Sequence, residues 1–186
     1  YINGRAIVIA DAKRGDIGNT SSQYAHAVLK TMGYDAITIS PYMGRDAIEP
    51  FLVDIEKGVF VLAMTSNPRA AEIQNNQNDS PPLYQKVVKI ANDLNEGDNI
   101  GLVVGATQIN VMETIRELSD GLSWLVPGVG TQGGEIEQAV EISNQNGIGI
   151  INISRGILYS GNGSMADIIK SAHKYTEQIQ EIVCNL

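Results

Sequence analysis

The chain has 186 residues, 43% of them hydrophobic and 18% charged, a composition that predicts one soluble globular domain over residues 1–186. Its formal net charge of −8 argues against binding nucleic acid or an anionic membrane surface, because both partners require a basic field. The single cysteine, Cys184, excludes an internal disulfide framework and a cysteine-based zinc site. No apolar run approaches the length of a membrane span, and we expect a cytoplasmic protein.

Short β-branched and apolar runs recur along the chain and are typical of buried parallel strands. In chain order they cover 6–10, 36–39, 59–63, 100–104, 124–126 and 148–153. The patterns between the runs predict helices over 21–32, 46–57, 83–94, 109–118, 136–146 and 166–183. Alternation of strand and helix predicts an α/β fold with a parallel sheet.

Two architectures fit this alternation, a doubly wound sheet and a barrel. A doubly wound sheet usually has a glycine-rich fingerprint in its first turn, whereas here the polar residues follow several strands, which favours a (β/α)8 TIM barrel. A complete barrel needs roughly 250 residues at roughly 30 per unit, so the six predicted strands leave about two units missing. The chain enters an apolar run almost directly after Tyr1, and we expect the missing units to precede it.

The residues after the first run are the strongest candidates for chemistry. Asp11 and Lys13 are two apart on a predicted strand, so their side chains point to the same face, and Asp16 follows in the loop. Flanking carboxylates keep an ammonium protonated, which suits a proton donor and argues against a Schiff-base lysine. An exposed salt-bridge cluster is the plain alternative.

Later strand ends suggest how a substrate is held. Two segments together predict a phosphate site. One is the glycine-rich segment 127–134, which begins at Pro127 and includes Gln132, and the other is Ser154-Arg155-Gly156. Thr65-Ser66-Asn67-Pro68 offers small polar side chains for an imide or amide edge, although a helix cap is an equal alternative. We find no His, Cys or carboxylate set with metal-ligand spacing, and we expect no metal site.

Residues 11–20, Asp-Ala-Lys-Arg-Gly-Asp-Ile-Gly-Asn-Thr, resemble the Asp-x-Lys-x-x-Asp-Ile-x-x-Thr signature of the orotidine 5′-monophosphate decarboxylase family. The segments 65–68, 127–134 and 154–156 resemble later motifs of that family in the same order, so the resemblance covers essentially the whole chain. The pattern is most similar to the longer bacterial subgroup. Ser154 stands where the family often has glycine.

The resemblance implies cofactor-free decarboxylation of orotidine 5′-monophosphate (OMP) to uridine 5′-monophosphate (UMP) in pyrimidine biosynthesis. It implies that Lys13 protonates C6 of the pyrimidine and that Asp11 lies near the departing carboxylate. Asp16 and Thr20 would reach the neighbouring subunit's site in a homodimer with shared active sites. Ser66 would bond the pyrimidine, Gln132 and Arg155 would hold the phosphate, and the loop that starts at Pro127 would close over it.

The resemblance also implies an aspartate and a lysine on the first two barrel strands, and no residue of this chain matches them. Two other functions stay open. One is that of a metal-dependent sugar-phosphate decarboxylase or synthase of the same superfamily, which needs a carboxylate-bound divalent metal. The other is that of an inactive barrel fragment that only binds a nucleotide or dimerises.

Overall fold

The computed structural model describes residues 2, 4–76, 78, 80–119, 121–130 and 136–186. Strands and helices alternate along the chain, which confirms the predicted α/β class. The chain divides into two compact units, Tyr1–Met64 with Ala71–Val103, and Thr65–Ala70 with Val104–Leu186. Among the helices so described, none combines the length and apolar character that crossing a membrane requires.

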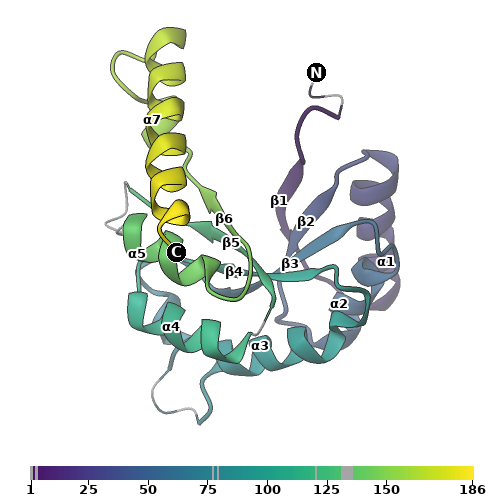
Figure 1. The fold of residues 1–186 in the computed structure, drawn as a ribbon. Helices are drawn as coiled ribbons and strands as arrows, with labels where there is room; N and C mark the ends of the chain where they lie inside the picture. The colour runs from purple at the N-terminus through teal and green to yellow at the C-terminus, as the bar shows by residue number, and fades with distance from the viewer. Residues whose placement is uncertain (1, 3, 77, 79, 120, 131–135) are drawn as a thin grey trace. The chain divides into compact units, whose positions relative to one another are not determined.

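The first unit is built on parallel strands in chain order (Figure 1). Strand β1 (Ile9–Arg14) pairs with β2 (Ala36–Ile39), and β2 pairs with β3 (Gly58–Met64). Strand β4 (Ile100–Val104) follows next to β3. All four residues of β2 are buried, as expected of a strand covered on both faces.

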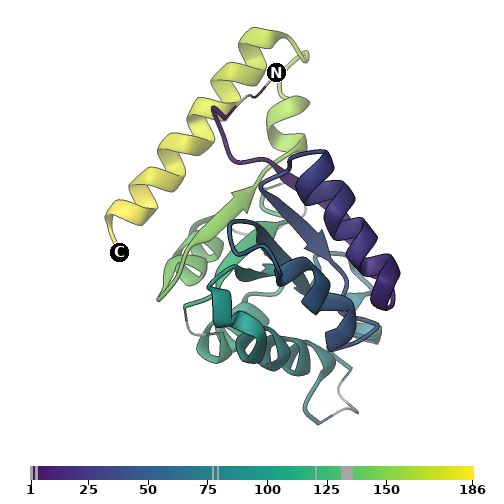
Figure 2. The same ribbon diagram turned by 90° about the vertical axis from the view of Figure 1, so that its right-hand side faces the viewer.

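The helices of the first unit complete its core. They are α1 (Gly18–Ala25), which continues as a π-helical segment, His26–Thr31, then α2 (Arg45–Leu52), α3 (Leu83–Leu94) and the short 3₁₀ turns Ala70–Glu72 and Asn95–Gly97. Helices α1 and α2 lie side by side (Figure 2). The inward faces bury Phe51 of α2 and Val88 of α3, each at most 1% exposed.

The second unit contains β5 (Ser123–Pro127) paired in parallel with β6 (Gly149–Asn152). Its helices are α4 (Ile109–Leu118), α5 (Ile136–Asn144), α6 (Arg155–Leu158) and the long α7 (Met165–Cys184). Trp124 and Arg116 lie at its centre, 0% and 5% exposed, with the guanidinium carbon 3.8 Å from the ring centroid. The Arg116 side chain donates to the backbone carbonyls of Leu122, Ile142 and Ser143 at 3.0, 3.3 and 2.7 Å.

Most predicted elements are confirmed, and α3 and α4 match at both ends. The apolar run places the first strand too early, over 6–10, because hydrophobicity marks only part of its extent. Pairing with β2 begins at Ile9, opposite Ala36, whereas Ile7 is 76% exposed. The ladder of backbone hydrogen bonds decides where a strand lies, and here it runs on through the polar residues.

The predicted helix over 46–57 was too long, since α2 ends at Leu52. Val53 and Ile55, which appeared to continue its apolar pattern, are 83% and 64% exposed, so no burial stabilises a further turn. Helix α6 was not predicted at all. The single-domain organisation over residues 1–186 stays a prediction.

Candidate active site

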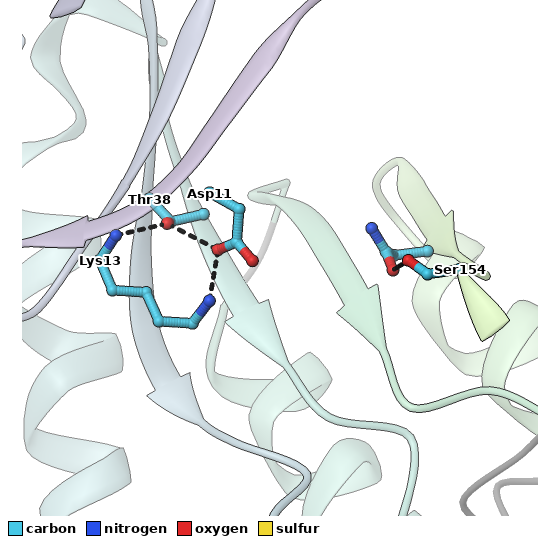
Figure 3. A network of polar contacts seen from close by, with 5 residues as sticks. Asp11, Lys13, Thr38 and Ser154 are labelled. Atoms are coloured by element: carbon cyan, nitrogen blue, oxygen red, sulfur yellow. Dashed lines mark hydrogen bonds and ion pairs between the residues drawn. The ribbon is translucent and has the colours of Figure 1, made fainter.

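Asp11, Lys13 and Thr38 form a hydrogen-bonded cluster in the first unit (Figure 3). Oδ1 of Asp11 accepts from Nζ of Lys13 at 2.5 Å and from Oγ1 of Thr38 at 2.9 Å. The same Thr38 hydroxyl oxygen accepts from the backbone N–H of Lys13 at 3.0 Å. Because Thr38 is 0% exposed on the fully buried strand β2, its hydroxyl is a fixed point that holds both site residues.

The backbone around Lys13 is not that of a regular strand. Lys13 has a φ of +47°, in the left-handed region, and the pairing of β1 with β2 shifts register between Ala10 and Arg14. A lysine in this region is uncommon and adopts it only where surrounding contacts impose it. The side chains of Asp11 and Lys13 therefore meet as predicted, but at a bulged strand end.

The charge state of Asp11 follows from this cluster. Partial burial alone would raise the pKa of the Asp11 carboxyl, but hydrogen bonds from Lys13 and Thr38, together with the charge of Lys13, outweigh it and lower the pKa. The side chains of Lys13 and Asp11 are 50% and 63% exposed, so the ion pair itself adds little to stability. The ammonium is thus paired with a carboxylate and still accessible to a ligand.

Asp16 lies just before α1 and Thr20 lies in its first turn, and neither takes part in that cluster. The carboxylate of Asp16 accepts from the N–H of Ile17 at 2.8 Å, and its carbonyl accepts from the hydroxyl of Ser21 at 2.6 Å. Thr20 is in the first turn of α1, where its N–H donates to the carbonyl of Ile17 at 3.1 Å. Both side chains are half-buried, and their predicted role in a partner's site stays a prediction.

In the second unit, the backbone of Ser66 lies close to the backbone of Gly105. A Cβ at Gly105, directly after β4, would lie 2.6 Å from the nitrogen and 2.8 Å from the Cα of Ser66, so only glycine fits there. The hydroxyl of Thr107 donates to the Ser66 carbonyl at 3.5 Å, and that of Thr65 donates to Oδ1 of Asn67 at 2.6 Å. The half-buried Ser66 hydroxyl is therefore carried on a constrained segment.

Pro127 ends strand β5, and its carbonyl accepts from the N–H of Ala106 at 3.0 Å. The turn that follows depends on glycine, since Gly128 and Gly130 have φ values of +94° and +83°. The candidate phosphate ligand Gln132 lies outside the described residues. The described part of the loop supports a tight turn directly after the strand.

Arg155 is the first residue of α6 and is exposed. Within the described part of the chain, its guanidinium makes no hydrogen bond or ion pair, which leaves its donors available to an anion. The preceding Ser154 donates from its hydroxyl to Oδ1 of Asn152 at 3.3 Å (Figure 3). The Ser154 side chain thus bonds back to the last residue of β6.

Sequence reasoning missed Thr38 and Gly105. Thr38 is the one polar residue in the apolar run 36–39, and Gly105 directly follows the run 100–104, so both signals were present. Neither could be interpreted without knowing which strand lies next to which. Among the described residues, no three His, Cys, Asp or Glu side chains gather as metal ligands would.

Comparison with known proteins supplies the family. The family model described as "Orotidine 5′-phosphate decarboxylase / HUMPS family" matches residues 2–168. The chain belongs to this family. Its resemblance to the orotidine 5′-phosphate decarboxylases, first seen in residues 11–20, is therefore confirmed over most of its length.

Two curated orotidine 5′-phosphate decarboxylases illustrate the relationship. That of Haloarcula marismortui is 48% identical over 165 residues, which are 87% of this chain and 60% of the relative. That of Dehalococcoides mccartyi is 41% identical over 189 residues, 98% of this chain and 69% of the relative. The chain thus spans about 60% of the length of the Haloarcula relative.

Solved structures of the orotidine 5′-phosphate decarboxylase family agree with the fold. The OMP decarboxylase of Leishmania donovani matches this chain with a TM-score of 0.82 at 34% identity. The match covers 94% of this chain and 67% of the Leishmania chain. The Methanocaldococcus jannaschii enzyme, solved with the inhibitor BMP, matches with a TM-score of 0.77 at 27% identity. That match covers 94% of this chain and 74% of the Methanocaldococcus chain. The parallel α/β arrangement is that of this family, while the number of barrel units stays a prediction.

Proposed function

We propose that this chain serves in the cofactor-free decarboxylation of OMP to UMP. The observation that carries the proposal is the hydrogen-bonded cluster of Asp11, Lys13 and Thr38, located in the segment that resembles the family signature. Relatives named orotidine 5′-phosphate decarboxylase, 41% and 48% identical, support the same reaction.

Lys13 is proposed to stabilise and then protonate the reacting carbon. Loss of CO₂ leaves the bonding electron pair on C6 of the pyrimidine, and a preorganised ammonium nearby stabilises that developing negative charge. Lys13 then transfers a proton to C6, which gives UMP and a neutral amine that solvent reprotonates. The bond to the Asp11 carboxylate, 2.5 Å long, orients the ammonium before the substrate arrives.

The remaining predicted residues are proposed to bind the nucleotide. Ser66 would bond the edge of the pyrimidine, while Arg155 and Gln132 would hold the 5′-phosphate under the loop that starts at Pro127. The exposed guanidinium of Arg155 supports this assignment. Binding energy from the remote phosphate would then stabilise loop closure and the transition state.

The complete enzyme is proposed to be a cytoplasmic homodimer in which Asp16 and Thr20 enter the partner's site. Two further barrel units, with the aspartate and lysine of the family array, would complete the eight-unit barrel and the catalytic site. The exposed start of α1 supports a role for this segment beyond its own unit, since Ile17 is 63% exposed there.

The test follows the decarboxylation of OMP by absorbance, with and without EDTA, after intact mass spectrometry has established which chain is in the assay. With the two further barrel units present, we expect chelator-resistant turnover that is abolished in Lys13→Ala and retained in the matched control Lys30→Ala, which removes an exposed lysine of the π-helical segment. Near-normal turnover by Lys13→Ala would refute the mechanism. Turnover that EDTA abolishes would point to a metal-dependent reaction, and no turnover by the wild-type enzyme with all barrel units present would refute the proposed function.

A further inference from the structure

Tyr175, on helix α7, lies against two segments that are far apart in sequence, both within the second unit. A Cβ built at Gly156 would lie 2.7 Å from the Tyr175 hydroxyl oxygen and 3.3 Å from Cε2 of its ring. A Cβ at Gly130 would lie 3.4 Å from the same oxygen. One phenol group therefore lies close to the turn after β5 and close to the start of α6.

A second contact ties α7 to the start of α6. Ser171 is one helical turn before Tyr175 on α7, and its hydroxyl donates to the carbonyl of Gly156 at 2.8 Å. Both side chains are half-buried. The backbone that directly follows Arg155 is thus held by a hydrogen bond and by an aromatic ring from the same helix face.

The two segments that Tyr175 contacts are the ones proposed above to bind the phosphate. Gly130 belongs to the turn that follows Pro127, and Gly156 directly follows Arg155. Gly130 also needs glycine for its φ of +83°, whereas Gly156 has no such backbone requirement. At Gly156 the close approach of the phenol is therefore what excludes a side chain.

We propose that Tyr175 is a positioning residue that holds the turn at Gly130 and the Arg155–Gly156 segment in the arrangement that receives a nucleotide 5′-phosphate. The inference rests on the proposed function and extends it to a residue outside every motif of the family signature discussed above. It predicts that positions 156 and 175 are coupled in nucleotide binding. A ring that only packed in the core of the unit would contribute to stability without such coupling.

A double-mutant cycle in the enzyme with all barrel units present, with UMP as the probe, tests this coupling by calorimetry. Gly156→Ala should weaken UMP binding by about tenfold or more, because its Cβ would be 2.7 Å from the phenol oxygen. In the Tyr175→Phe background that oxygen is gone and the nearest remaining contacts would be 3.2 and 3.3 Å, so the same substitution should cost about threefold or less. Tyr159→Phe, which alters a tyrosine that is 77% exposed, should leave UMP affinity unchanged.

Tyr175→Ala provides an independent measurement. We expect it to weaken UMP binding by about tenfold and to speed hydrogen exchange of the amides at 128–130 and 155–158 without ligand. Additive effects of Gly156→Ala and Tyr175→Phe, or unchanged UMP affinity in Tyr175→Ala, would overturn the inference while leaving the proposed function intact. Failure of the wild type to bind UMP would overturn both.

Discussion

Thr38→Val is the most informative substitution in the site, because valine keeps the shape of threonine and removes only the hydroxyl. The change deletes two hydrogen bonds. In one, of 2.9 Å, the hydroxyl donates to the ionised Asp11 carboxylate, and in the other, of 3.0 Å, it accepts from the backbone N–H of Lys13. Bonds to charged groups contribute about 1.5–3 kcal/mol and neutral ones about 0.5–1.5 kcal/mol. Since Asp11 is 63% exposed, water replaces part of the first bond, and we expect a total loss of about 1–2 kcal/mol.

The free energy of unfolding from urea titration measures this loss, and turnover of OMP measures its effect on the site. Turnover should fall about tenfold or more, because Lys13 keeps its ammonium but loses the contact that fixes its backbone. Thr38→Ser keeps the hydroxyl and should retain most of the activity. Thr176→Val removes an exposed hydroxyl bonded within α7 at 2.9 Å and should change stability by less than about 0.5 kcal/mol. Wild-type stability and turnover in Thr38→Val would refute the role assigned to this hydroxyl.

Two further predictions concern stability. Arg116→Met should lower the free energy of unfolding by about 3 kcal/mol in urea titrations, because it leaves three buried carbonyls without their donor, and a loss below about 1 kcal/mol would contradict this. The pKa of Asp11 lies below its ordinary value of 3.8, so the ionised carboxylate stabilises the fold above that pH, and this stabilisation is lost as the pH falls through the lowered value. Asp11→Asn should therefore be less stable than wild type only above about pH 4, and the loss in free energy of unfolding should stay below about 1 kcal/mol. A stability difference that does not vary with pH would refute this account.

The sequence located the candidate catalytic pair, Asp11 and Lys13, but not the residue that holds it. Asp11 and Lys13 were identified because two charged residues at the end of an apolar run are unusual, and their spacing placed the two side chains together. Thr38 was not identified, because its importance depends on β1 and β2 being neighbours. Pairing between strands that are 25 residues apart is a property of the folded chain.

The sequence by itself determined the α/β class, most strands and helices, and the residues that could carry chemistry. These follow from local patterns, since the hydrophobic period, the glycines that end helices and the charged residues at strand ends all depend on residues close together in sequence. Only the tertiary structure decided that β1 extends through Arg14 with Lys13 in a left-handed conformation. It also decided that the backbone of Ser66 lies against Gly105, and that the Tyr175 hydroxyl lies close to Gly130 and Gly156. Each of these depends on contact between segments distant in sequence, where the packing of one backbone against another sets the geometry.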